Sequence, residues 1–148
     1  MSVDCRAVVR QFYAFVDEGD MSGISQLLSD TFRWHFAGIP TAFNKQTSAG
    51  FVQAFRAAFP DMHHSLDSQI VEGDRVVTPL TFHGTHQGEL RGISASGQRV
   101  EIRALNIHRI VSGKIAEAET VVDMMTLMQQ IGAIPAPGGA RHNDGTAD

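Results

Sequence analysis

The 148-residue sequence has one cysteine, no excess of basic residues and no long apolar run. The lone Cys5 cannot form a disulfide within the chain, and we assign it no catalytic role. Lys and Arg number 12 against 16 Asp and Glu, and the resulting net charge of -4 disfavours a nucleic-acid partner. No apolar stretch approaches the roughly 18 residues that span a membrane, and the N-terminal stretch lacks a signal-peptide pattern. We therefore expect a cytoplasmic protein with neither nucleic acid nor membrane as partner.

Several motifs of catalysis and ligand binding are also missing. No Gly-x-Ser-x-Gly occurs, so a nucleophile elbow is not predicted. The stretch 84–88, Gly-Thr-His-Gln-Gly, lacks the lysine and the spacing of a phosphate loop. Adjacent histidines at 63–64, and His83 with His86, point to opposite faces of a strand and make poor metal pairs. The sequence predicts no metal site.

The composition suits one globular domain. Hydrophobic residues make up 43% and charged residues 19%, which is enough apolar material for a single core in a chain of this length. We expect this domain over residues 1–134. The tail over 135–148 holds two prolines, three glycines and few apolar residues, so we expect it to be flexible.

Apolar periodicity predicts the secondary structure. A 3.6-residue period indicates helices over about 4–18, 21–28 and 44–58, and a short last helix over 123–131. The stretch 31–36 alternates aromatic and polar residues, as a strand with one wet face does.

After Pro60 the sequence changes to segments in which apolar and polar residues alternate, as they do in strands. Glycine turn signals separate four strands over roughly 62–72, 75–87, 98–111 and 114–122. The order predicts an α+β fold in which three N-terminal helices pack on a strongly curved antiparallel sheet, followed by a short C-terminal helix. Such a sheet encloses a pocket against the helices.

Two of the predicted strands carry candidate polar groups for that pocket. Asn106 and His108 are two residues apart on one strand, so their side chains share a face with apolar neighbours, as on a pocket floor. The alternative for His108 is an ordinary core histidine. Glu119 and Asp123 share a face of the next strand, with Cα atoms roughly 13 Å apart if it is extended.

Asp123 has two competing interpretations. A carboxylate in an apolar cavity has a raised pKa and can act as a general base. Asp123 also precedes the last predicted helix, where Asp is a favoured N-cap. Loss of a cap would cost about 1 kcal/mol of stability, whereas loss of a base would remove activity from an intact fold.

Aromatic and polar residues near the helices complete the candidate binding site, although at helical spacing many of the aromatics are ordinary core. The residues expected to contact a substrate are Trp34, His35, Phe51, Phe55, His86 and Glu119.

An ordered set of short segments resembles the SnoaL-like polyketide cyclases of the nuclear-transport-factor-2-like superfamily over roughly 5–132. The segments are Phe59-Pro60-Asp61, Gly73-Asp74, Gly84-Thr85-His86-Gln87-Gly88, Ser96-Gly97, Gly113-Lys114-Ile115, Asp123 and Gln130-Ile131-Gly132. The resemblance implies a cone-shaped α+β barrel, commonly a homodimer, that closes a ring by intramolecular aldol condensation without metal or organic cofactor. It implies Asp123 as acid/base, with Asn106 and His108 binding and polarising the substrate. Glu119 departs from the family, which has a Trp there.

The leading hypothesis is therefore cofactor-free acid/base chemistry on a small hydrophobic carbonyl compound. Two alternatives stay open. One is an epoxide-hydrolase- or isomerase-like enzyme of the same fold, and Glu119 slightly favours the epoxide-hydrolase form because it makes the cavity wetter. The other is a non-catalytic ligand-binding or dimerisation module.

Overall fold

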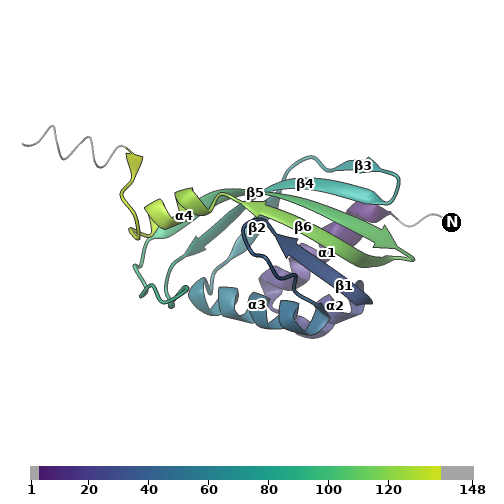
Figure 1. The fold of residues 1–148 in the computed structure, drawn as a ribbon, viewed down its shortest axis with the longest axis horizontal. Helices are drawn as coiled ribbons and strands as arrows, with labels where there is room; N and C mark the ends of the chain where they lie inside the picture. The colour runs from purple at the N-terminus through teal and green to yellow at the C-terminus, as the bar shows by residue number, and fades with distance from the viewer. Residues whose placement is uncertain (1–3, 138–148) are drawn as a thin grey trace, which may run out of the picture.

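The computed structural model describes residues 4–137, and within them the chain forms four helices and one six-stranded sheet (Figure 1). The helices are α1 (Cys5–Glu18), α2 (Met21–Leu27), α3 (Lys45–Ala58) and α4 (Met124–Gln130). The strands are β1 (Leu28–Phe36), β2 (His63–Leu66), β3 (Ile70–Glu72), β4 (Arg75–Thr85), β5 (Arg99–Val111) and β6 (Lys114–Val122). The predicted α+β class is confirmed.

Local capping explains where the two long helices begin and end. The Asp4 side chain accepts hydrogen bonds from the first turn of α1, and Gly19 ends this helix in the left-handed conformation at φ 75°. Asn44 and Thr47 form a reciprocal capping box at the start of α3.

The sheet has the strand order β1-β6-β5-β4-β2, and β3 pairs with β4 beyond the end of β2. Two details differ from the sequence-based expectation. The strand predicted over 62–72 is two strands, because the polar residues 67–69 leave the ladder between them. The sheet is also mixed rather than wholly antiparallel, since β1 lies parallel to β6.

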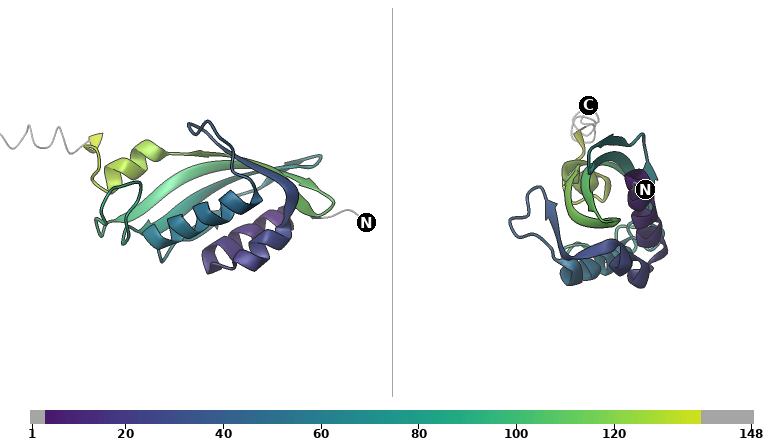
Figure 2. Two further views of the ribbon diagram at one scale, coloured as in Figure 1. Left: turned by 60° about the horizontal axis from the view of Figure 1, so that its bottom comes forward. Right: turned by 90° about the vertical axis from the view of Figure 1, so that its right-hand side faces the viewer.

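The sheet is strongly curved but not closed, with β1 at one edge and β2 and β3 at the other. Figure 2 shows α1, α2 and α3 together on the concave side, while α4 continues from β6 at one end of the sheet. This arrangement leaves the hollow of the sheet facing the helices.

A tight turn and a shift in register align the strands β5 and β6. Ser112 and Gly113 both have positive φ, at 52° and 77°, as a two-residue hairpin turn of type I′ requires. The turn lets β6 return antiparallel to β5, and a register shift between Arg109 and Ile110 then places Asn106 beside Thr120. Both side chains are buried, so they point to the concave face.

The described residues bear on two further expectations. No helix within residues 4–137 is long and apolar enough to cross a membrane. Of the tail predicted over 135–148, residues 138–148 lie outside the described part of the chain.

Candidate functional site

A cavity of about 670 Å³ lies between the concave face of the sheet and the helices α1 and α3. Its inner lining comes from Met62 and from side chains of β1, β2, β4, β5 and β6, together with those two helices. The loops over 37–43 and 89–91, and the first turns of α4, contribute the remainder. A volume of this size is typical of a small-molecule site.

Aromatic rings form one continuous wall of the cavity. Trp34 and Phe36 have ring centroids 4.9 Å apart, and Phe36 lies 4.8 Å from Phe51. The series continues from Phe51 to Phe55 at 5.6 Å and from Phe55 to Phe82 at 5.3 Å. Rings packed in this way offer flat apolar surfaces on which a planar ligand can stack.

A chain of hydrogen bonds crosses the floor of the cavity. The indole Nε1 of Trp34 donates to Thr120 Oγ1 at 2.8 Å, and Thr120 Oγ1 donates to Asn106 Oδ1 at 2.7 Å. The chain uses the acceptor side of the Asn106 amide, so its Nδ2 group remains as the donor side.

Asn106 Nδ2 has no hydrogen-bond partner among the described residues, although the side chain is only 2% exposed. A buried donor without an acceptor costs about 1–3 kcal/mol. Asn106 lines the cavity, so a ligand oxygen placed there would satisfy it. Among the lining residues, Asn106 therefore has a buried donor that is free to bind a ligand.

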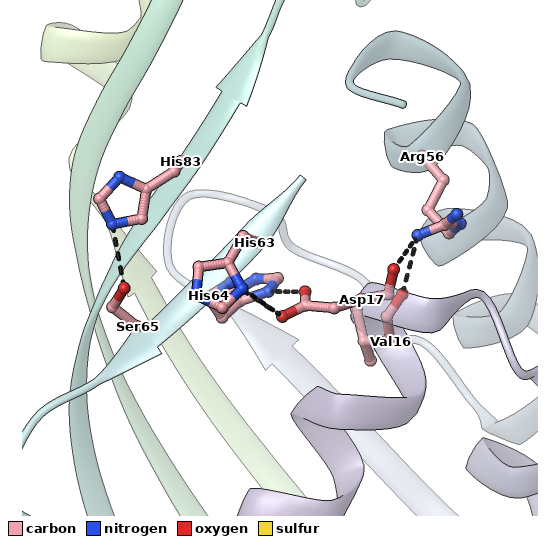
Figure 3. A network of polar contacts seen from close by, with 7 residues as sticks. All are labelled: Val16, Asp17, Arg56, His63, His64, Ser65 and His83. Atoms are coloured by element: carbon pink, nitrogen blue, oxygen red, sulfur yellow. Dashed lines mark hydrogen bonds and ion pairs between the residues drawn. The ribbon is translucent and has the colours of Figure 1, made fainter. Parts of the chain in front are cut away.

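His64 also lines the cavity, and its imidazole is held by Asp17 of α1 (Figure 3). His64 Nδ1 lies 2.6 Å from Asp17 Oδ1, and the main-chain N–H of His64 donates to Asp17 Oδ2 at 2.9 Å. A carboxylate only accepts, so Nδ1 carries a proton, and in the neutral ring Nε2 carries the lone pair. Nε2 has no hydrogen-bond partner within residues 4–137.

Aromatic rings surround this pair. The ring of His64 lies 4.9 Å from Tyr13 and 5.3 Å from Phe82. Burial, and secondarily the Asp17 carboxylate, raises the pKa of Tyr13 above its ordinary value, so Tyr13 stays a neutral phenol. Arg56 donates to the main-chain carbonyls of residues 16 and 17, which secures the end of α1 that carries Asp17 (Figure 3).

The Asp17–His64 pair was not predicted from the sequence. The two residues lie 47 positions apart, and no motif joins them. Only the pairing of β2 with β4, which sets His64 beside Phe82, turns the imidazole inward.

Asp123 lies outside the cavity, contrary to the first of its two interpretations. Its side chain is exposed and caps α4, accepting from the Thr126 main-chain N–H at 3.0 Å and from Thr126 Oγ1 at 2.6 Å. These hydrogen bonds lower the pKa of Asp123, so the expectation of a raised pKa is wrong. The N-cap interpretation describes the observed geometry.

Glu119 and His35 also lie outside the cavity, which corrects their expected position. Both are exposed on the outer face of the sheet, where His35 Nε2 lies 3.7 Å from a carboxylate oxygen of Glu117. Side chains alternate along a strand, so their neighbours Trp34 and Thr120 point inward instead.

His108 is buried behind the cavity rather than in its lining. Its ring packs against Phe12 and Tyr13, each at 5.8 Å, and neither ring nitrogen has a partner among the described residues. Burial lowers the pKa of His108 to about 4, so it is neutral in the folded protein. The expectation that His108 touches the substrate is therefore not supported by its position.

His86 is likewise buried outside the lining. The main-chain N–H of Ser96 donates to His86 Nδ1 at 3.1 Å, which fastens the loop between β4 and β5. This histidine has a structural position in the loop.

Trp34, Phe51, Phe55 and Asn106 lie in the lining, as the sequence analysis expected; their roles in binding stay predictions. Among residues 4–137, no group of three or more metal-ligating side chains could hold a metal ion.

An α+β fold with a curved sheet over an aromatic cavity defines a class of small-ligand enzymes and binding proteins. Comparison with known proteins identifies the family: the model of the SnoaL-like polyketide cyclases matches residues 6–131. The chain belongs to the SnoaL-like polyketide cyclase family.

Named relatives include both cyclases and a hydroxylase. The chain is 30% identical over 104 residues to the aklanonic acid methyl ester cyclase DnrD of Streptomyces peucetius, covering 69% of this chain and 72% of that protein. AclR of Streptomyces galilaeus, assigned as a hydroxylase, superposes with a TM-score of 0.80 at 28% identity, over 89% of this chain and 98% of its own. IdmH of Streptomyces antibioticus, assigned as a polyketide cyclase, superposes with a TM-score of 0.79 at 27% sequence identity. The superposition covers 88% of this chain and 99% of IdmH. Membership indicates an enzyme, and the names given to the relatives include both cyclase and hydroxylase.

Proposed function

We propose that the protein is a polyketide-cyclase-type enzyme that carries out cofactor-free, aldol-type acid/base chemistry on a hydrophobic carbonyl compound. The observation that carries this proposal is the unpaired Nδ2 donor of Asn106 at the floor of the aromatic cavity. Family membership and the cyclase DnrD, a relative with 30% identity, support the reaction class.

In this proposal Asn106 Nδ2 donates to the carbonyl oxygen that is attacked during ring closure. Negative charge grows on that oxygen, and a preorganised donor in a water-poor site stabilises it more than bulk water would. The hydrogen bonds through Thr120 to Trp34 fix the amide before the substrate arrives. The apolar wall excludes water and holds the reacting carbons close together.

The lining disfavours a water-activating mechanism based on a buried aspartate. Within residues 4–137, the one carboxylate that lines the cavity belongs to Glu89, which is exposed on a loop. Asp123 and Glu119 both lie outside it. The epoxide-hydrolase alternative therefore lacks the acidic group that it needs inside the hollow.

The test compares two soluble probes that differ by their carbonyls, anthraquinone-2-sulfonate and anthracene-2-sulfonate. Trp34 is the one tryptophan of the chain and lines the cavity, so its fluorescence reports binding. We expect the quinone to bind at least about 5-fold more tightly, an advantage of about 1 kcal/mol for one hydrogen bond. Asn106→Leu should remove that advantage.

Thr78→Val is the matched control, because Thr78 is a buried polar neighbour of Asn106 on β4 that does not line the cavity. It should leave the quinone preference intact. Equal affinity of the wild-type protein for both probes would contradict the proposed role of Asn106.

The homodimer also stays a proposal. Leu105 and Val121 are paired across β5 and β6 and are 44% and 56% exposed on the outer face of the sheet. We expect a second copy to cover them, and light scattering of wild type and Val121→Glu tests it: a monomeric wild-type protein would contradict it.

A further inference from the structure

Four titratable side chains line the described cavity: Tyr13, His64, Glu89 and Arg91. Tyr13 holds its proton because burial raises its pKa, and an arginine stays charged. Glu89 and Arg91 are exposed on the loop that follows β4. His64 is the remaining group, and imidazoles as a class exchange protons near neutral pH.

We infer that His64 is the group that moves protons in this cavity, and that Asp17 positions it. The inference deepens the proposed function and rests on it. Histidine held by a carboxylate through Nδ1 is a general arrangement for a base, since the carboxylate fixes the tautomer and stabilises the imidazolium that forms.

The geometry of the pair fits this role. Asp17 contacts His64 twice, through the ring and through the main chain, so the ring cannot turn without losing its partner. The side chains are 12% exposed for His64 and 17% exposed for Asp17, so bulk water screens the contact only weakly. The titratable group in contact with the imidazole is Asp17. On the other side of that carboxylate, His63 Nδ1 lies 3.5 Å from Asp17 Oδ2.

The position of His64 relative to Asn106 limits the ligand. His64 pairs with Phe82 of β4, and Phe82 pairs with Ile102, four residues from Asn106 along β5. On a flat sheet this separates the two Cα atoms by roughly 16 Å, which the concave curvature shortens. One carbonyl is too small to touch both groups, so the ligand presents a C–H bond to His64 and a separate carbonyl to Asn106.

The resulting reaction balances without a further reactant. The α-C–H bond breaks, its proton goes to His64 Nε2, and the electron pair stays on carbon as an enolate. That carbon bonds to the carbonyl carbon whose oxygen is held by Asn106, and the oxygen becomes an alkoxide. The imidazolium then releases its proton to water and the alkoxide takes up a proton from water, so no proton is gained or lost overall, and His64 is left neutral with a new C–C bond formed.

The experiment uses 1-(2-naphthyl)hexane-1,5-dione, which has a methyl ketone at one end and an aryl ketone at the other. Exchange of its methyl protons in D₂O is followed by mass spectrometry, and its binding by Trp34 fluorescence. We expect His64→Gln to slow the enzyme-catalysed exchange at saturating probe by about 100-fold or more with unchanged Kd. Asp17→Asn, which can still accept from the main chain of His64, should slow it by at least about 10-fold.

His63→Gln is the matched control, since His63 adjoins the same carboxylate but does not line the cavity. This variant should exchange the methyl protons of the probe at the wild-type rate. Exchange that persists at the wild-type rate in His64→Gln would overturn the inference and leave the proposed function standing. A wild-type protein that binds the probe without accelerating exchange would refute the proposed function itself.

A second readout needs no turnover. Nitrogen-15 NMR of the histidines should show the Nδ1-protonated form for His64 in the wild type and a mixture of tautomers in Asp17→Asn. An Nε2-protonated His64 in the wild type would overturn the inference.

Discussion

Replacement of His108 by leucine should change how stability depends on pH. Burial lowers the pKa of His108 from 6.5 to about 4, a gap of about 2.5 pH units that corresponds to about 3 kcal/mol. The folded protein binds fewer protons than the unfolded chain between these two values. The free energy of unfolding therefore falls as pH drops from 6.5 towards 4, and this group causes no further loss below that.

Leucine at this position cannot be protonated and leaves no ring nitrogen unpaired. We expect His108→Leu to be at least as stable as wild type at pH 7.5. At pH 4.5 it should be more stable by about 2–3 kcal/mol, measured by urea unfolding at both pH values. His35→Gln, at an exposed histidine, is the control that should keep the wild-type pH dependence. A parallel loss of stability in wild type and His108→Leu would refute the reasoning.

Three further substitutions test the described packing. Asp123→Ala should lower thermal stability by about 1 kcal/mol through loss of the α4 cap, with no loss of probe binding. Gly88→Ala should destabilise by about 1–3 kcal/mol in urea, because an added Cβ would lie 2.2 Å from the carbonyl oxygen of Ala57; a neutral result would contradict the close approach. Trp34→Phe removes the donor to Thr120 and should weaken the preference for anthraquinone-2-sulfonate over anthracene-2-sulfonate, measured by calorimetry. An unchanged preference would show that the hydrogen bonds from Trp34 through Thr120 do not hold Asn106 in place.

Much of the fold follows from local patterns. Apolar residues recur with a clear 3.6-residue period in the helices and alternate with polar residues along β4, β5 and β6. This alternation correctly predicts that Asn106 and His108 lie on the buried face of β5. The parallel pairing of β1 with β6 has no local signature, because it joins segments about 80 residues apart in the chain. The break at 67–69 depends equally on how β2 and β3 share one partner strand.

The site was less predictable for a related reason. The register with β5 turns Glu119 outward and Thr120 inward, and Asp123 lies just beyond the end of β6 as the N-cap of α4. A carboxylate before a helix caps it or serves catalysis with the same residue pattern, so sequence alone does not separate the two roles for Asp123. The contact between Asp17 and His64 exists only after α1 and β2 come together.

The most direct test of the account is ring closure of 1-(2-naphthyl)hexane-1,5-dione by wild type, His64→Gln and Asp123→Asn, followed by absorbance at saturating probe. We expect Asp123→Asn to keep the wild-type rate and His64→Gln to lose about 100-fold or more. Loss of closure in Asp123→Asn with full activity in His64→Gln would contradict the account, because it would place proton transfer at the cap of α4 rather than inside the cavity.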